Sequence, residues 1–108
     1  MQFGERVRAL RIGCAFTQLT LANRLGVSMS YISKVENNAL HFGDYPSEKF
    51  IHRLATELNA DEDELMVLAD KVPAGIREKI KQRPILFQTI AKMDERSLDR
   101  LTKQLVEK

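Results

Sequence analysis

The sequence predicts an all-α protein, in which a five-helix bundle precedes a C-terminal extension of two to three short helices. Apolar residues recur at helical spacing, Gly and Pro number only five and three among 108 residues, and no convincing strand pattern is present. Pro73 marks the boundary, so we expect one part to span residues 1–72 and the other 73–108. With 44% hydrophobic residues, the chain has enough apolar side chains for a small core.

The first predicted helix supplies Phe3, Val7, Leu10 and Ile12 to that core. Cys14 follows near the end of this helix and is the only cysteine of the chain. A lone cysteine excludes an internal disulfide and a multi-cysteine metal site. We interpret Cys14 as a small packed residue, with a redox sensor as the weaker alternative.

Residues 17–37, TQLTLANRLGVSMSYISKVEN, are typical of two short helices joined by a tight turn. Thr17 and Ser28 are good N-caps, because each hydroxyl can accept a hydrogen bond from a backbone N–H of the first turn. Ala22 is small enough for two helices to cross closely. Gly26 lies where a left-handed residue would end the first helix.

The sequence of the second helix in this segment predicts one buried face and one face that points outward. Ile32 and Val35 fall at the spacing that would bury the helix against its neighbour. The side chains left to face outward are Met29, Ser30, Tyr31, Ser33 and Lys34. Two helices in this arrangement form a helix-turn-helix, whose second helix enters the DNA major groove.

The loop that follows contains several aromatic and basic residues. Asn38 can adopt the left-handed conformation that a helix exit requires. We expect Phe42 and Tyr45 to fold back onto the bundle, because exposed aromatic residues would form a sticky patch. His41 and Lys49 flank the loop and could reach phosphates, although solvent exposure without a role is the simpler interpretation of His41.

Two further helices complete the predicted bundle. Ser47 can cap a fourth helix that runs to about Leu58. Asp61, followed by Glu64, resembles a capping box at the start of a fifth helix. The acidic residues of its first turn, 61–64, suit the helix dipole, and this explains them better than a metal site.

The C-terminal extension reads as a helix over residues 74–83, a second helix that begins at Pro84 and a third helix capped by Asp94. The last helix carries a short apolar stripe of Leu98, Leu101 and Leu105. The stripes of the last two helices can form a dimer interface or receive a partner protein. Alternatively, they pack back on the bundle and enlarge its core. We favour dimerisation.

Four segments resemble the phage Cro and cI repressors and the related xenobiotic-response-element (XRE) regulators. These segments are VRALR, TQLTLANRLGVS, YISKVEN and IHRLATELNADEDEL, and the resemblance runs from about Phe3 to Leu68. It implies a lambda-repressor-like bundle of about five helices, which binds palindromic operators on double-stranded DNA as a homodimer.

The resemblance also implies roles for single residues. Gln18 matches a position that holds a phosphate and braces the recognition helix, and Asn37 matches a contact to the DNA backbone. The positions that reach base edges are occupied by Ser28, Met29, Ser30 and Lys34. The complete DNA-binding set that we expect is Thr17, Gln18, Ser28, Met29, Ser30, Tyr31, Ser33, Lys34 and Asn37.

Two positions of the expected recognition helix, about Ser28–Asn37, depart from the family pattern. Many relatives carry Gln or Arg where this chain has Met29 and Ser30, so Met29 can offer only an apolar contact, for example to a thymine methyl group. Lys34 is the one long donor and can reach a guanine or a phosphate. Tyr31 either contacts a phosphate or sugar through its hydroxyl or merely covers the rim of the helix.

Arg11 and Glu36 match a buried ion pair that links the first helix to the third. Removal of one partner from such a pair leaves an uncompensated charge and costs about 3–5 kcal/mol. The resemblance therefore assigns this pair to the scaffold and not to DNA.

The expected function is sequence-specific binding of double-stranded DNA as a transcriptional regulator, in the first instance a repressor. The alternatives are the antitoxin of a toxin–antitoxin pair and the controller of a restriction–modification system, with C-terminal helices that bind a protein partner. We expect no catalysis, cofactor or metal. The chain has only two histidines, no Gly-rich phosphate loop and no nucleophile–base pair at recognisable spacing.

The charge is small but unevenly distributed. Residues 1–45 carry a net +2, residues 46–72 a net −4 and residues 73–108 a net +4, which gives +2 in total. We expect the acidic segment to face away from DNA. No segment resembles a signal peptide or a membrane span, so we expect a cytoplasmic protein that works at the nucleoid.

Overall fold

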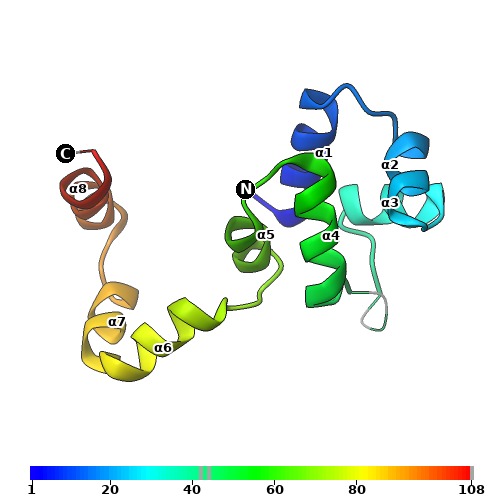
Figure 1. The fold of residues 1–108 in the computed structure, drawn as a ribbon. Coiled ribbons are helices and arrows are strands. Elements are labelled where there is room, and N and C mark those ends of the chain that lie inside the picture. The colour runs from blue at the N-terminus through cyan, green and yellow to red at the C-terminus, as the bar shows by residue number, and fades with distance from the viewer. Residues whose placement is uncertain (42, 44, 108) are drawn as a thin grey trace. The chain divides into compact units, whose positions relative to one another are not determined.

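The computed structural model describes residues 1–41, 43 and 45–107, and these residues form eight α-helices and no strand (Figure 1). The helices are α1 (Phe3–Gly13), α2 (Gln18–Leu25), α3 (Met29–Glu36), α4 (Glu48–Leu58), α5 (Glu62–Leu68), α6 (Ala74–Gln82), α7 (Pro84–Ala91) and α8 (Glu95–Val106). The prediction of an all-α protein, with a five-helix bundle followed by a helical C-terminal extension, is therefore confirmed. The extension holds three described helices, of which α8, with 12 residues, is longer than any helix of the bundle. None of the described helices is both long and apolar enough to cross a lipid bilayer.

The chain divides into two compact units, Met1–Pro73 with α1–α5 and Ala74–Lys108 with α6–α8. In the first unit, α3 packs against α1 and α2, while α4 packs against α2 and α5 (Figure 1). This unit positions the α2–turn–α3 segment on a bundle of three other helices.

The starts of the helices follow from local hydrogen bonds. The side chains of five N-cap residues each accept a backbone N–H from the first turn, and these residues are Thr17, Ser28, Ser47, Asp61 and Asp94. Such a bond satisfies one of the amide groups that a helix start leaves without a partner. The starts of these five helices are therefore determined by residues within three or four positions.

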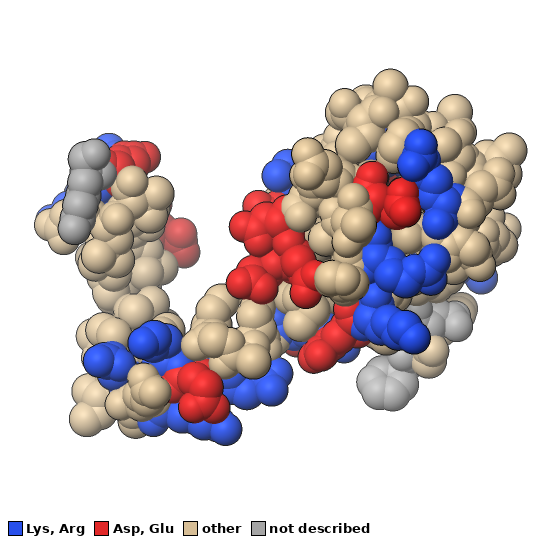
Figure 2. Space-filling model, in the orientation of Figure 1, with Lys and Arg blue, Asp and Glu red and all other residues tan. Residues whose placement is uncertain are grey.

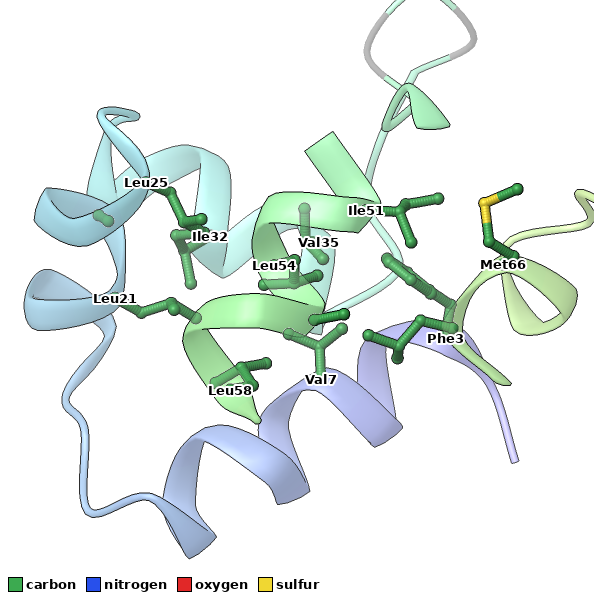
Figure 3. Close-up of a cluster of buried hydrophobic side chains, with 13 residues drawn as sticks. Phe3, Val7, Leu21, Leu25, Ile32, Val35, Ile51, Leu54, Leu58 and Met66 are labelled. Carbon is green, nitrogen blue, oxygen red and sulfur yellow. The ribbon is translucent and has the colours of Figure 1, made fainter. Parts of the chain in front are cut away.

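The core of the first unit is built by apolar side chains that converge from all five helices (Figure 3). The buried hydrophobic residues are Phe3, Val7, Leu21, Ala22, Leu25, Ile32, Val35, Ile51, Leu54, Ala55, Leu58, Leu65 and Met66. Ala22 is fully buried, and its small side chain allows α2 to approach its neighbours closely.

Ile12 does not belong to this core, because 56% of its surface is exposed. At about 100° per residue it lies on the side of α1 opposite Phe3 and Val7, which are buried. The expectation that Ile12 is a core residue was therefore wrong.

The loop between α3 and α4 also differs from the expectation. Tyr45 is 63% exposed and does not fold back into the core, whereas the next residue, Pro46, is buried. The expectation for Tyr45 was therefore wrong. Phe42, which was expected to behave like Tyr45, lies outside the described residues.

The second unit exposes much of its apolar surface. None of the described residues of α6, α7 and α8 is buried. Ile85 is 77% exposed and Leu105 is 65% exposed. Exposed apolar side chains that gather in a small unit indicate a surface available to another chain.

Candidate nucleic-acid interface

The turn between α2 and α3 sets the direction of α3. Gly26 ends α2 in the left-handed conformation, with φ of +70°, which a residue without Cβ adopts at little cost. The N–H of Val27 then donates to the carbonyl oxygen of Ala22 at 3.0 Å, and Ser28 starts α3 by accepting the N–H of Tyr31 at 3.0 Å. The segment is therefore a helix-turn-helix in which local backbone geometry and hydrogen bonds determine both the end of α2 and the start of α3.

One face of α3 is buried and the opposite face is open. Ile32 and Val35 belong to the core. The expected DNA-binding residues at the start of α3 and along its open face, Ser28, Met29, Ser30, Lys34 and Asn37, are exposed, whereas Tyr31 and Ser33 are half-buried. The open face of an α-helix has a size that the DNA major groove admits.

Arg11 and Glu36 form an ion pair between α1 and the last turn of α3. Arg11 donates from Nε to Glu36 Oε2 at 2.6 Å and from a terminal nitrogen to Glu36 Oε1 at 3.0 Å. The side chain of Glu36 is 1% exposed and that of Arg11 is 11% exposed. The hydrogen bonds and the charge of Glu36 raise the pKa of Arg11. Arg11 also donates to the carbonyl oxygen of Phe16 at 2.8 Å, so one guanidinium ties the α1–α2 turn to α3.

Gln18 joins this network. Its amide nitrogen donates to Glu36 Oε1 at 3.1 Å, which links the first residue of α2 to the end of α3. A Gln amide carries two N–H groups, so the contact with Glu36 leaves a second donor for another acceptor. Gln18 can therefore brace α3 and donate to a phosphate at the same time.

Two further residues of the expected DNA-binding set are held by intramolecular contacts. The side-chain amide of Asn37 donates to the carbonyl oxygen of Ser33 at 2.9 Å. The ring of Tyr31 packs edge-on against the ring of Phe50 from α4, with centroids 5.6 Å apart and an interplanar angle of 85°. This ring contact joins α3 to α4.

Two arginines, one from α2 and one from α4, stabilise the region around the turn. The sequence alone did not predict a role for either of them. Arg53 donates to the carbonyl oxygen of Leu25 at 2.7 Å and so satisfies an acceptor at the end of α2. Arg24 lies over the ring of Phe16, 4.4 Å from its centroid, and donates to Glu57 at 3.2 Å. These contacts join residues 8 to 33 positions apart, and no local pattern in the sequence indicates them.

Three arginines of the bundle take part in ion pairs. Arg6 pairs with Glu64, Arg11 with Glu36 and Arg24 with Glu57. Lys34 is exposed on the open face of α3. Lys34 and the backbone N–H groups at the starts of α2 and α3 are candidates for phosphate contacts. Among the described residues, no group of three or more His, Cys, Asp or Glu side chains is arranged to hold a metal ion.

Comparison with known proteins agrees with this geometry. The sequence profile of a protein family described as "Helix-turn-helix domain" matches residues 2–68. Among solved structures, the fold is similar to a chain of the "SinR protein/SinI protein complex", with a TM-score of 0.51 and 19% sequence identity. That similarity covers 95% of this chain and 93% of the other. No curated protein sequence matches the chain.

Proposed function

We propose that the protein is a repressor that binds an inverted-repeat operator as a homodimer. The chain belongs to the helix-turn-helix domain family, in an XRE/Cro–cI-like form, and is a DNA-binding transcription regulator. The single observation that carries the proposal is the open face of α3, which a capped turn and a buried ion pair hold on a rigid bundle. Rigid support matters because base recognition requires side chains at defined positions.

The open face of α3 supplies the base contacts. Lys34 donates to a guanine edge or to a phosphate, and Ser30 hydrogen-bonds to a base edge. Met29 contributes an apolar contact, for which a thymine methyl group is the natural counterpart. Ser28, at the N-terminus of the helix, lies where recognition helices approach the bases.

Neutral groups around α3 supply the phosphate contacts. Thr17 and Gln18 stand at the N-terminus of α2, where backbone N–H groups and the helix dipole favour an anion. Asn37, Tyr31 and Ser33 border the recognition surface at the other side and are suited to contact the DNA backbone. Such contacts fix the register of the protein and carry no sequence information themselves.

Dimerisation follows from the size of the recognition surface. One recognition helix reads only a few base pairs, so useful specificity requires two half-sites about one helical turn apart. The exposed apolar side chains of α7 and α8, including Ile85 and Leu105, supply an interface for a second copy. The proposal therefore places dimerisation in residues 74–108 and DNA contact in residues 1–73.

A second candidate function uses the same helices for another protein. The similar solved structure is a complex between SinR protein and SinI protein, so a chain with a related fold assembles with a protein partner. The exposed apolar residues of α7 and α8 suit such a partner equally well. An antitoxin or a restriction–modification controller would combine the binding of a protein partner through these helices with DNA binding.

A selection from random duplex DNA with the purified protein tests the proposed function. We expect sequencing of the bound fraction to return an inverted repeat with a fixed spacing between its halves. A single asymmetric site would contradict the homodimer. Absence of any enriched sequence, with only salt-sensitive general binding, would contradict operator recognition and favour the function directed at a protein partner.

A further inference from the structure

The ends of α3 and α4 are closed in the same way, each with an asparagine in the left-handed conformation. Asn38 has a φ of +54° and Asn59 a φ of +51°. After α3, the N–H of Ala39 donates to the carbonyl oxygen of Lys34 at 2.9 Å. The N–H of Asn38 itself donates to the carbonyl oxygen of Val35 at 3.3 Å. The same pair of backbone bonds closes α4. The two asparagines therefore have matching backbone roles, and their side chains can be compared directly.

The side chains of these two asparagines differ in their contacts. The side-chain oxygen of Asn38, Oδ1, accepts the backbone N–H of Gly4 from α1 at 3.3 Å. The side chain of Asn59 makes no hydrogen bond to any of the described residues. Glycine adopts a positive φ at less cost than asparagine. The contact with α1 is therefore what Asn38 provides and a glycine at this position would not.

The N–H of Gly4 lies in the first turn of α1 and has no acceptor within that helix. The first four N–H groups of any α-helix are left without such a partner. Gln2, the residue before α1, makes no side-chain hydrogen bond to them, and Gly4 is buried. A buried donor without an acceptor is costly. Asn38 therefore caps α1 from the end of another helix, 34 positions away in the sequence.

Asn38 also gives α3 a second point of attachment to α1. The first is the ion pair between Glu36 and Arg11. Gly4 and Arg11 are seven positions apart on α1, which is about 10 Å along the helix axis. A helix that is held at one point can pivot, whereas two points at this separation fix its angle to its neighbour. The open face of α3 is therefore oriented by both attachments together.

We propose that Asn38 is a positioning residue for base recognition: its side chain, through Gly4, fixes the angle at which the open face of α3 meets the bases. The inference rests on the proposed function, because it requires that α3 reads the DNA. Contacts to base edges need side chains within about 0.5 Å of their productive place. General affinity for DNA comes from charge and does not need this precision. Loss of the attachment should therefore reduce discrimination between sequences more than it reduces general affinity.

The test compares two glycine variants of the full chain, N38G and N59G. Both variants place a residue that adopts a positive φ readily, and of the two only N38G removes an acceptor from α1. The readout is the affinity for the selected operator divided by the affinity for an arbitrary duplex of the same length. Fluorescence anisotropy measures both affinities at one salt concentration. We expect N38G to lower this ratio at least about fivefold, the size of one lost base contact, and N59G to leave it unchanged.

A further variant separates positioning from stability. Q2D places an aspartate at the N-cap of α1, where its carboxylate can accept N–H groups of the first turn. We expect N38G to lower the Tm and N38G/Q2D to recover part of the loss. The affinity ratio of N38G/Q2D should stay as low as that of N38G, because a local cap does not join α1 to α3. Recovery of the ratio together with the Tm would show that Asn38 acts through stability alone.

The conservative variant N38D keeps the acceptor and adds a negative charge. On the face of the bundle shown in Figure 2, Asp and Glu side chains lie beside Lys and Arg side chains, so the attraction of this face for DNA depends on a balance of charges. One more carboxylate weakens binding to every duplex, and the affinity ratio cancels this general effect. We expect N38D to retain the affinity ratio of the wild-type protein.

Hydrogen exchange, followed by NMR in the free protein, tests the contact itself. The amide of Gly4 should exchange faster in N38G than in the wild-type protein and at the wild-type rate in N59G. Unchanged exchange in N38G would exclude the hydrogen bond.

Three results with DNA would overturn the positioning role. These are an unchanged affinity ratio in N38G, an equal fall in N38G and N59G, and a ratio in N38D as low as that in N38G. If no operator is selected at all, the proposed function fails and the positioning role fails with it. An operator that N38G discriminates as well as the wild-type protein does would overturn the positioning role alone.

Discussion

Gly4 of α1 and Val35 of α3 meet backbone to backbone. A Cβ atom on Gly4 would lie 2.3 Å from the carbonyl oxygen of Val35 and 2.8 Å from that of Glu36. The N–H of Gly4 also donates to the side chain of Asn38 at 3.3 Å. The first turn of α1 therefore packs directly against the backbone at the end of the recognition helix α3.

We expect G4A to destabilise the protein, because the new methyl group would push against backbone atoms that cannot rotate away. Overpacking of this kind costs about 1–3 kcal/mol. The matched control is G13A at the end of the same helix, where nothing lies within 4 Å of the added Cβ. Thermal unfolding should show a lower Tm for G4A and an unchanged or slightly higher Tm for G13A. Equal melting temperatures for the two variants would mean that α1 does not approach α3 as described.

The ion pair between Arg11 and Glu36 gives a second prediction for stability. We expect E36A to lower the free energy of unfolding by about 3–5 kcal/mol, because it leaves the largely buried Arg11 without its partner. E57A removes the partner of the exposed Arg24 and should cost no more than about 1 kcal/mol. Urea unfolding measures the free energy of unfolding of both variants.

A double-mutant cycle tests the pairing itself. The loss of unfolding free energy in R11M/E36A should be smaller than the sum of the losses in R11M and E36A. Additive losses would show that Arg11 and Glu36 do not interact.

Lys34 is expected to contribute directly to DNA binding. K34A should weaken binding to the selected operator by about 1–3 kcal/mol if Lys34 reads a base. If it contacts only a phosphate, the loss should be similar on all duplexes and the salt dependence should become shallower by about one contact. K103A, which removes an exposed lysine from α8, serves as the control. Unchanged operator affinity of K34A in an anisotropy titration would remove Lys34 from the interface.

The proposed dimer interface in α7 and α8 can be tested without truncation. Ile85 and Leu105 are exposed, so I85D/L105D should leave the fold of one chain intact while it places charges in the interface. We expect sedimentation equilibrium to show a dimer for the wild-type protein and a monomer for the variant, with weaker binding to a two-half-site operator. A variant that remains dimeric would place the interface elsewhere.

Features determined by neighbouring residues could be predicted from the sequence. The N-caps Thr17, Ser28 and Asp94, and the left-handed Gly26, involve hydrogen bonds or conformations within a few positions of the residue itself. For the same reason, the left-handed conformation expected of Asn38 is present, with φ of +54°. The buried and open faces of α3 follow equally from the 3.6-residue period.

Features that depend on the meeting of two distant surfaces could not be predicted. The space at Gly4 is limited by atoms of residues 35 and 36, and the donor to the end of α2 is Arg53, 28 positions away from its acceptor. Ala15 adopts a φ of +59° without any glycine or asparagine to indicate it. Tyr45 is exposed while its neighbour Pro46 is buried, and the composition of the loop does not indicate this difference.

The central claim, that the open face of α3 reads bases, is tested most directly by a second selection with S30Q. Ser30 is exposed on α3, so the longer side chain can be accommodated, and Gln pairs with adenine through two hydrogen bonds in the major groove. We predict that S30Q selects an inverted repeat with the wild-type spacing and a changed base at one position of each half-site. Selection of the unchanged wild-type site by S30Q, with unchanged affinity, would contradict recognition through α3.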